Sequence, residues 1–179
     1  MTVCIYAAAS NRIAQEYIEE CERLGEELAK YRFSLIYGAG STGLMGAVAR
    51  GFRKQNGEVI GVTPKFIHVM EPVFDDCTKI IHTETMAERK EIMENNASCF
   101  IIAPGGVGTL DEFFQIVTLT DLGRKDKPII VFNINGYYTK LLNYLYECAD
   151  RGFINVNVLD KIYVADTVED IIDFFNERI

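Results

Sequence analysis

The sequence has 179 residues, of which 49% are hydrophobic, and its formal net charge is −8 at pH 7. This length and composition fit one domain with its own core, and the acidic balance argues against a nucleic-acid polymer as partner, because proteins that bind one need a basic surface. The five cysteines are scattered without a CxxC pair, and no apolar run approaches the roughly 18 residues of a membrane span, so we expect reduced thiols, no membrane partner and a cytoplasmic location.

Short apolar runs alternate with amphipathic helical stretches along the whole chain. Strands are expected at residues 3–8, 33–37, 59–62, 79–81, 99–103, 129–132 and 162–164. Helices are expected at about residues 12–30, 44–55, 86–96, 110–122, 137–151 and 168–178. The alternation predicts a Rossmann-like, doubly wound α/β fold, with a mostly parallel seven-stranded sheet and helices on both faces. We expect a single nucleotide-binding domain over residues 1–179, with its ligand beyond the carboxyl ends of the strands.

A first glycine-rich loop follows the second predicted strand, where residues 38–46 read GAGSTGLMG. Three of its glycines, Gly40 among them, have the spacing of a dinucleotide-binding fingerprint. However, Thr-Pro stands at residues 63–64, where an NAD site would carry an acidic residue for the ribose, so an NAD site is disfavoured. The loop is either a tight turn that lets its helix pack close to the sheet or a loop that contacts a nucleotide.

A second glycine-rich loop follows the fifth predicted strand, where residues 104–112 read PGGVGTLDE. Its glycines permit close approach of the backbone, and the next helix presents free N–H groups, which together suit a phosphate with the Thr109 hydroxyl as a further donor. The same residues also fit a capping box, in which Thr109 caps the helix and Glu112 reaches back to it. Both interpretations stay open, although three glycines in four positions give more backbone freedom than a cap requires.

A charged helix is predicted between the two loops, opening at residues 85–88 with a further possible capping box. Met86, Arg89, Lys90 and Met93 lie three or four residues apart and therefore share one face. Two methionines indicate that this face points inward, where unpaired cations are costly, so the two basic side chains should meet protein carboxylates or a bound anion. Alternatively, they extend to solvent or pair with neighbouring glutamates.

Together, MAERK at residues 86–90 and PGGVGTLDE at 104–112 resemble the LOG family, the cytokinin riboside 5′-monophosphate phosphoribohydrolases long labelled lysine decarboxylases. The resemblance runs along nearly the whole chain and includes short motifs at residues 43–46, 122–123, 127–128, 135–138 and 152–154. It implies hydrolysis of the N-glycosidic bond of a purine nucleoside 5′-monophosphate, AMP or N6-modified AMP, to free base and ribose 5-phosphate. It also implies a homodimer with active sites near the subunit interface and no cofactor.

By this resemblance, Arg89 and Glu112 correspond to the family's catalytic arginine and glutamate. Residues implied to bind the substrate are Ser10, Gly40, Met86, Lys90, Gly105, Gly106, Val107, Gly108 and Thr109. The second loop would hold the 5′-phosphate with help from Ser10, Met86 would lie near the base, and Lys90 or nearby acids would act across the interface.

The chain departs from the family's pattern at three places. Residues 7–10 read AAAS where the family usually has Cys-Gly-Ser-Ser, and Ala87 and Leu119 replace a common histidine and tryptophan. The change at residues 7–10 puts the Ser10 contact and the shape of the loop after the first predicted strand in question. Because Arg89 and Glu112 are kept, we expect these changes to alter which substrate is preferred more than they alter the reaction itself.

The expected mechanism places the Glu112 carboxylate beside C1′ of the ribose, where it would stabilise an oxocarbenium-like sugar and orient or deprotonate the attacking water. Asp111 is adjacent in sequence, so on a helix it points roughly 100° away and cannot form a carboxylate pair with Glu112. Arg89 would hold Glu112 ionised or bind a substrate oxygen. The sequence does not identify the donor of a proton to the leaving base.

Other functions stay open beside hydrolysis. The main alternative is a non-catalytic carrier of a nucleotide or phosphorylated cofactor, which would need the phosphate loop but not the carboxylate; transfer of the ribosyl group to another acceptor is a further one. His68 and His82 form no metal pattern with the cysteines, so no metal is expected, and His82 is a weaker candidate for a general base. Decarboxylation with pyridoxal phosphate would need a lysine that forms a Schiff base. Lys90 is the only lysine near the inferred phosphate cleft, and the resemblance accounts for it without that cofactor, so decarboxylation is disfavoured.

Overall fold

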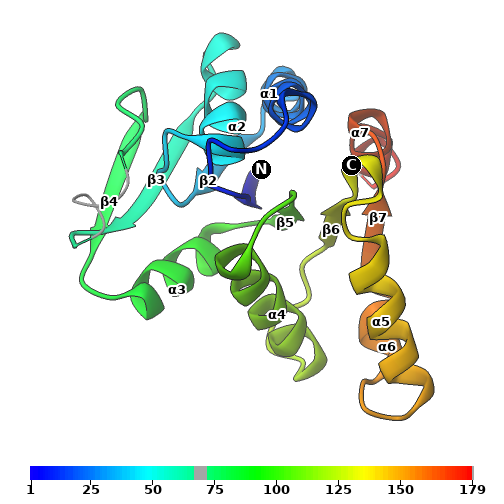
Figure 1. The fold of residues 1–179 in the computed structure, drawn as a ribbon. Coiled ribbons are helices and arrows are strands. Elements are labelled where there is room, and N and C mark those ends of the chain that lie inside the picture. The colour runs from blue at the N-terminus through cyan, green and yellow to red at the C-terminus, as the bar shows by residue number, and fades with distance from the viewer. Residues whose placement is uncertain (67–71, 179) are drawn as a thin grey trace.

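The computed structural model describes residues 1–66 and 72–178 of the chain, in which seven parallel strands form one sheet (Figure 1). The strands are β1 (Thr2–Tyr6), β2 (Ser34–Tyr37), β3 (Val59–Pro64), β4 (Lys79–Thr83), β5 (Cys99–Ile102), β6 (Ile129–Phe132) and β7 (Ile162–Ala165). The helices are α1 (Gln15–Lys30), α2 (Gly43–Lys54), α3 (Met86–Asn96), α4 (Val107–Asp121), the 3-10 helix η2 (Ile134–Gly136), α5 (Thr139–Asp150), α6 (Val156–Leu159) and α7 (Val168–Asn176). None of the helices in these residues is both long and apolar enough to cross a membrane.

The strand order is β4-β3-β2-β1-β5-β6-β7, so the chain builds outward from β1 in one direction and then returns to build outward in the other. This confirms the predicted doubly wound fold, with every strand pair parallel. The order reverses between β1 and β5, and the loops that follow these two strands therefore diverge to opposite faces of the sheet. In such folds the ligand-binding crevice forms at this reversal.

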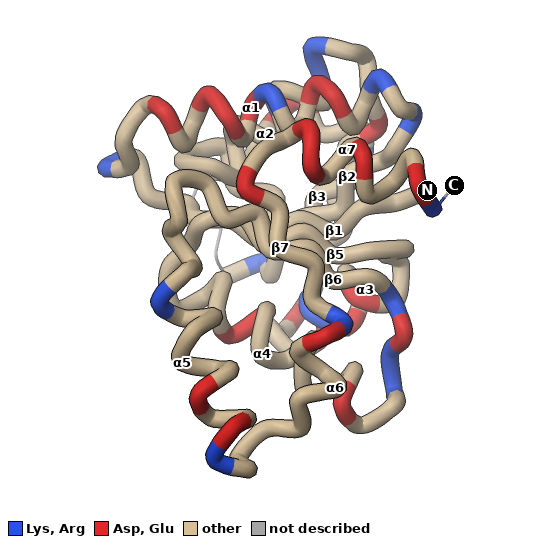
Figure 2. The backbone as a smooth tube through the Cα atoms, turned by 90° about the vertical axis from the view of Figure 1, so that its right-hand side faces the viewer, with Lys and Arg blue, Asp and Glu red and all other residues tan. Residues whose placement is uncertain are grey.

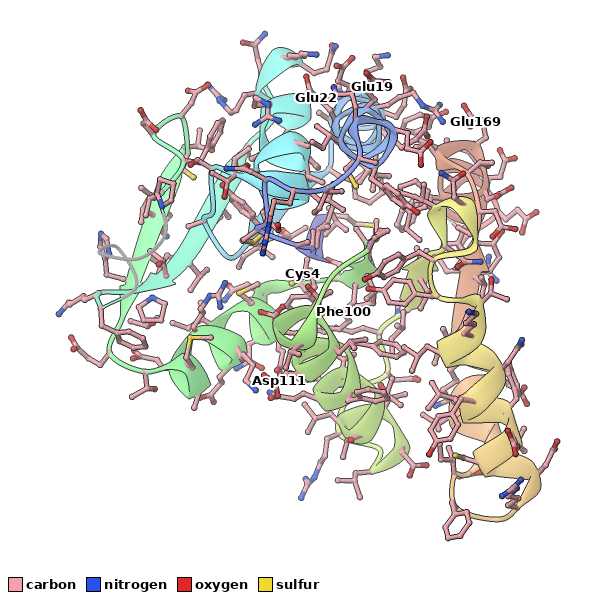
Figure 3. All side chains as sticks on the ribbon, in the orientation of Figure 1. Cys4, Glu19, Glu22, Phe100, Asp111 and Glu169 are labelled. Carbon is pink, nitrogen blue, oxygen red and sulfur yellow. The ribbon has the colours of Figure 1, made fainter. Side chains whose placement is uncertain are left out.

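Helices cover both faces of the sheet, because its strands are apolar on both sides (Figures 1 and 2). Along β1, Val3 and Ile5 pack into the core beneath α1, α2 and α7. Cys4 and Tyr6 point the other way, into the core beneath α3, α4 and α5. The first of these layers carries much of the chain's negative charge, with six glutamates on α1, and Figure 3 shows Glu19, Glu22 and Glu169 at its outer surface.

Two expectations about helix boundaries are wrong. Helix α4 begins at Val107, not near residue 110, because Gly106 is extended and its carbonyl accepts the first helical bond from the Leu110 N–H at 3.0 Å. Thr109 therefore lies inside the first turn and cannot cap the helix, which removes the capping-box interpretation of the second loop. Helix α1 begins at Gln15, not Arg12, because residues 11–14 form a turn after the β1 loop.

The capping box predicted at the start of α3 is half formed. The Thr85 hydroxyl accepts from the Glu88 N–H at 3.1 Å, as expected for a cap. The Glu88 carboxylate accepts from the N–H of Glu84 at 2.8 Å, one residue before the cap. The helix is therefore anchored firmly at the end from which Arg89 projects.

Candidate active site

A cavity of about 380 Å³ lies at the carboxyl ends of β1 and β5, where the strand order reverses. The loop after β1, helix α2, the first two turns of α3 and the start of α4 contribute its walls. Its lining residues are Ala7, Ala8, Ala9, Ser10, Met45, Met86, Arg89, Gly106, Gly108, Thr109, Asp111 and Glu112. The structure thus brings together Arg89, Glu112 and most of the residues that the sequence assigned to substrate binding.

The Arg89 side chain is held in place by backbone carbonyls at the ends of two neighbouring strands. It is only 8% exposed, its Nε donates to the Val62 carbonyl at 3.0 Å and its Nη2 donates to the Gly38 carbonyl at 3.4 Å. Its Nη1 lies 3.7 Å from the Glu112 carboxylate. Arg89 therefore does not extend to solvent, and its guanidinium presents a fixed positive charge to the cavity.

Gly38 leaves the space that the Arg89 guanidinium occupies, since a Cβ built at this position would overlap Nη2. We predict that Gly38→Ala displaces the guanidinium and lowers kcat/KM by about tenfold or more, because displacing a catalytic group by about 1 Å strongly reduces the rate. Gly40→Ala is the matched control in the same loop: its Cβ would meet the flexible end of the Met45 side chain, so the rate should fall much less. Equal losses in steady-state kcat/KM for the two variants would contradict this role of Gly38.

Glu112 is a buried carboxylic acid with an altered affinity for protons. The residue is 9% exposed, and burial raises the pKa of its carboxyl group to about 7, although the nearby Arg89 charge acts to lower that pKa. At 3.7 Å, the Arg89 guanidinium is too far from Glu112 to donate a good hydrogen bond. A carboxyl group with a pKa near 7 can both give and take a proton at neutral pH.

This raised pKa of Glu112 predicts a pH-dependent effect on stability. In the unfolded chain a glutamate ionises near its ordinary pKa, whereas folded Glu112 keeps its proton up to about pH 7. Its favourable contribution to folding is therefore complete below about pH 4.5 and is lost as the pH rises through 7. We expect Glu112→Gln to be more stable than the wild type at pH 8, by roughly 1–3 kcal/mol, with the difference shrinking toward pH 4.5.

Thermal unfolding of both proteins at matched concentration, between pH 4.5 and 8, measures this effect. Asp111→Asn is the control, because the Asp111 carboxylate is exposed and pairs with Lys90 at 2.9 Å. It should not be stabilised at pH 8. A stability difference between Glu112→Gln and the wild type that does not change with pH would contradict the burial account.

Lys90 and Asp111 form an ion pair at the rim of the cavity, between α3 and α4. Figure 3 shows Asp111 on α4 at the side that faces α3. Lys90 does not belong to the described residues that line the cavity, so its contact with substrate stays a prediction. The pair draws the Asp111 carboxylate toward Lys90, although Asp111 also lines the cavity that contains Glu112. That Asp111 and Glu112 do not act together on one substrate stays a prediction.

The start of α4 leaves several backbone N–H groups available to a ligand. Gly106 is the N-cap and makes no side-chain capping bond, and the first N–H groups of a helix have no carbonyl of their own helix to bond. A Cβ at Gly106 or Gly108 would meet nothing within 4 Å, so packing does not require glycine there. Open space above free N–H groups at a positive helix end suits an anion.

The other residues of the second loop lie around this helix start. Thr109 is buried and lines the cavity, and the absence of a side chain at Gly105 makes room for it. Val107 is 86% exposed and points outward. Gly105 lines a second cavity, of about 330 Å³, which shares Ala8, Ser10 and Gly106 with the first.

The first glycine loop acts mainly as a packed turn. The Leu44 N–H donates to the Ala8 carbonyl at 2.9 Å and the Thr42 hydroxyl donates to the Ala9 carbonyl at 2.8 Å, so this loop holds the loop after β1. Gly40 packs on Met45 and does not itself belong to the described lining, and its contact with a nucleotide stays a prediction.

Sequence reasoning missed Met45, which lines the cavity, and Tyr137 and Tyr138, which support the second loop. The Tyr137 hydroxyl donates to the Gly105 carbonyl and the Tyr138 hydroxyl to the Ala103 carbonyl, each at 2.8 Å. The family-like motif at residues 135–138 contains both tyrosines and could have indicated them.

The histidines take no identified part in the site. His82 lies on the edge strand β4 and is not among the described residues that line the cavity, whereas His68 falls outside the described residues. Within residues 1–66 and 72–178, no three side chains of His, Cys, Asp or Glu gather as a metal site would require.

Comparison with known proteins assigns the chain to a family. A model of the family described as "possible lysine decarboxylase" matches residues 45–175. The chain is 38% identical over 169 residues to a cytokinin riboside 5′-monophosphate phosphoribohydrolase of Mycobacterium tuberculosis. The aligned region covers 94% of this chain and 90% of the relative. An Arabidopsis thaliana protein with the same activity in its name is 36% identical over 152 residues, covering 85% of this chain and 67% of the relative.

Solved structures with the same fold include molybdenum cofactor proteins. The carrier protein from Chlamydomonas reinhardtii has a TM-score of 0.73 at 20% identity, and the superposition covers 98% of this chain and 96% of the carrier chain. The molybdenum cofactor binding protein from Rippkaea orientalis has a TM-score of 0.73 at 19% identity, with 98% and 95% of the two chains covered. At this identity the likeness establishes the fold alone.

Proposed function

Because the chain belongs to the LOG family, once described as possible lysine decarboxylases, we propose that it hydrolyses the N-glycosidic bond of a purine nucleoside 5′-monophosphate. The substrate is AMP or an N6-modified AMP, and the products are the free base and ribose 5-phosphate. One observation carries the proposal: a buried carboxyl group with a pKa near 7, Glu112, shares a cavity with the fixed Arg89 cation and the open N-terminus of α4.

The two ends of this cavity suit the two ends of a ribose phosphate. The free N–H groups of α4, with Ser10 and the Thr109 hydroxyl, would bind the 5′-phosphate. Glu112 lies about one and a half turns further along the helix, where the ribose would reach. Met86, at the start of α3, would lie beside the base.

In the reaction, the bond between C1′ and the base nitrogen breaks and its electron pair leaves with the base. The ionised Glu112 carboxylate stabilises the positive charge that develops on the sugar and takes a proton from the attacking water, whose oxygen bonds to C1′. The departing base gains a proton. Arg89 contributes to keeping Glu112 ionised, since its charge acts to lower the pKa of Glu112.

Incubation of the purified protein with AMP and with adenosine tests the proposal, with release of free base followed by chromatography. Remote binding of the phosphate supplies energy for catalysis, so we expect base from AMP at a rate at least about 100-fold above that from adenosine. A non-catalytic carrier would bind AMP and release no base. That outcome would replace the hydrolase with the carrier, the function of some proteins of the same fold.

A decarboxylase that uses pyridoxal phosphate does not fit the cavity. Such an enzyme holds its cofactor through a lysine, and none of the described residues that line this cavity is a lysine. Lys90, the lysine at the rim, is paired with Asp111.

The proposal includes a cytoplasmic homodimer. The five cysteines are free, as in a reducing compartment. Helices α4, α5 and α6 and the turns that follow α4 and α5 expose large apolar side chains: Phe114, Leu122, Tyr144, Phe153 and Val156. Phe153 lines one surface cavity with Phe114 and another with Tyr144. Phe114 lies on α4, so a second copy on this surface would pack against the helix that carries Glu112.

We predict that light scattering finds a dimer in the wild type and that Phe153→Glu weakens this dimer. Phe153 is 82% exposed in a single subunit, and a glutamate there would bury its charge between the two subunits. Phe66→Glu, at another exposed phenylalanine far from these helices in sequence, is the control and should leave the dimer intact. A monomeric wild type would contradict the homodimer without bearing on the chemistry.

A further inference from the structure

A buried hydroxyl group lies beneath the proposed active site and makes no regular hydrogen bond within residues 1–66 and 72–178. Tyr6 ends β1, is 2% exposed, and stacks its ring on Phe100 of the neighbouring strand, with ring centres 6.3 Å apart. Its hydroxyl oxygen is fully buried and makes no hydrogen bond of regular geometry to the described residues; the Cys4 thiol, a weak donor and acceptor, is its polar neighbour. Leaving such a group unsatisfied is costly, and phenylalanine would fill the same space without that cost, so the hydroxyl calls for an explanation.

The hydroxyl lies on the side of the sheet where Glu112 is buried. Tyr6 belongs to the core that α3, α4 and α5 cover, together with Cys4 and Phe100. Cys4 and Phe100 are register partners on β1 and β5, and Figure 3 shows them next to each other where α3 and α4 approach the sheet. Burial raises the pKa of Tyr6 strongly, and the Cys4 thiol and the carboxylates of Glu112 and Glu94 raise it further. The phenol therefore keeps its proton and remains a hydrogen-bond donor throughout the pH range of the enzyme.

Glu112, in turn, lacks a donor on this side. Among the described residues it accepts no hydrogen bond, and its ion pair with Arg89 is 3.7 Å long. The charged and titratable groups that face it are Arg89, Lys90 and Glu94 from α3, Asp111 from α4, and Cys4 and Tyr6 from β1. Of these, Tyr6 is a neutral donor whose bond would stabilise the ionised carboxylate without adding charge.

We propose that Tyr6 is a positioning residue for the reaction proposed above: its hydroxyl donates a hydrogen bond to the ionised Glu112 carboxylate, directly or through one water, and holds it toward C1′ of the substrate. This bond forms when Glu112 loses its proton, so it favours the form that the reaction uses. It thereby limits the rise in the pKa of Glu112 that burial causes.

Tyr6→Phe tests this inference, because it removes only the hydroxyl. Loss of the donor should raise the pKa of Glu112 by about one unit. Base release from AMP should then fall about tenfold at pH 6 and less than about twofold at pH 9, since Glu112 is ionised in both proteins at the higher pH. A purely structural role of Tyr6 would lower the rate equally at both values.

A second readout does not depend on activity. The pKa of the Glu112 carboxyl group can be followed by carbon NMR in protein labelled at the glutamate side-chain carboxyl, with Glu112→Gln to assign the signal. Tyr37→Phe is the matched control: Tyr37 ends the neighbouring strand β2, is equally buried, and has its hydroxyl 3.7 Å from the Cys77 sulfur, on the opposite face of the sheet. It should leave the pKa of Glu112 unchanged.

An unchanged Glu112 pKa in folded Tyr6→Phe, or an equal rise in both variants, would overturn the inference. If the wild type released no base from any nucleotide, the proposed function would fail, whereas the NMR titration would still decide whether Tyr6 bonds to Glu112.

Discussion

Glu112→Gln is expected to slow the release of base from AMP by about a thousandfold while AMP still binds. Glutamine has nearly the same shape as glutamate, so the cavity and the phosphate-binding end of α4 should be unchanged. Its amide carries no negative charge and accepts no proton, so it can neither stabilise the oxocarbenium-like sugar nor activate the water. The loss should therefore fall on kcat rather than on KM.

Single-turnover rates with excess enzyme, together with calorimetric binding of AMP, separate these two effects. Asp111→Asn tests the neighbouring carboxylate, which lines the same cavity but pairs with Lys90. It should retain at least about a tenth of the wild-type rate, because it loses only a surface ion pair. If Glu112→Gln kept most of its activity, or Asp111→Asn lost as much, Glu112 would not be the residue that acts at C1′.

Replacement of Arg89 is expected to have the second-largest effect. Arg89→Ala removes a buried cation that two backbone carbonyls hold 3.7 Å from Glu112, and the rate should fall by about 100-fold or more. Because the Arg89 charge lowers the pKa of Glu112, its loss should raise that pKa above 7. The acidic limb of the pH–rate profile should therefore move to higher pH.

Arg89→Lys separates charge from geometry. A lysine keeps the charge but cannot reproduce the fork of donors that contacts both the Val62 and Gly38 carbonyls. We expect it to restore the pKa of Glu112 in part while recovering little of the rate. Full recovery of kcat/KM in Arg89→Lys would show that the charge alone matters and that the fixed geometry does not.

The sequence predicted the fold well because its signals are local. Runs such as residues 99–102 and 129–132 are apolar throughout and bounded by polar or glycine-rich turns, which is typical of strands buried on both faces. The helix boundaries were less certain, and α4 shows why. The residues from Thr109 to Glu112 have the sequence of a capping box, but the same sequence can also lie inside the first turns of a helix. Only the extended conformation of Gly106 reveals that the helix begins earlier, at Val107.

The parts of the candidate site that lie in short sequence motifs could be predicted. The parts that depend on contacts between segments distant in sequence could not. Arg89 and Glu112 lie in recognisable segments. By contrast, the need for glycine at residue 38 follows from the position of the Arg89 guanidinium, which comes from a helix about 50 residues later. The ion pair of Lys90 with Asp111 and the burial of the Tyr6 hydroxyl likewise depend on how α3 and α4 pack over β1.

The most direct test of the proposed chemistry is to identify both products formed from AMP. Adenine and ribose 5-phosphate should accumulate in equal amounts with the wild-type protein and should nearly disappear with Glu112→Gln. Equal amounts would establish hydrolysis of the N-glycosidic bond. Adenine without ribose 5-phosphate would point to transfer of the ribosyl group to another acceptor, and intact AMP after prolonged incubation would contradict the assignment of this site as a hydrolase.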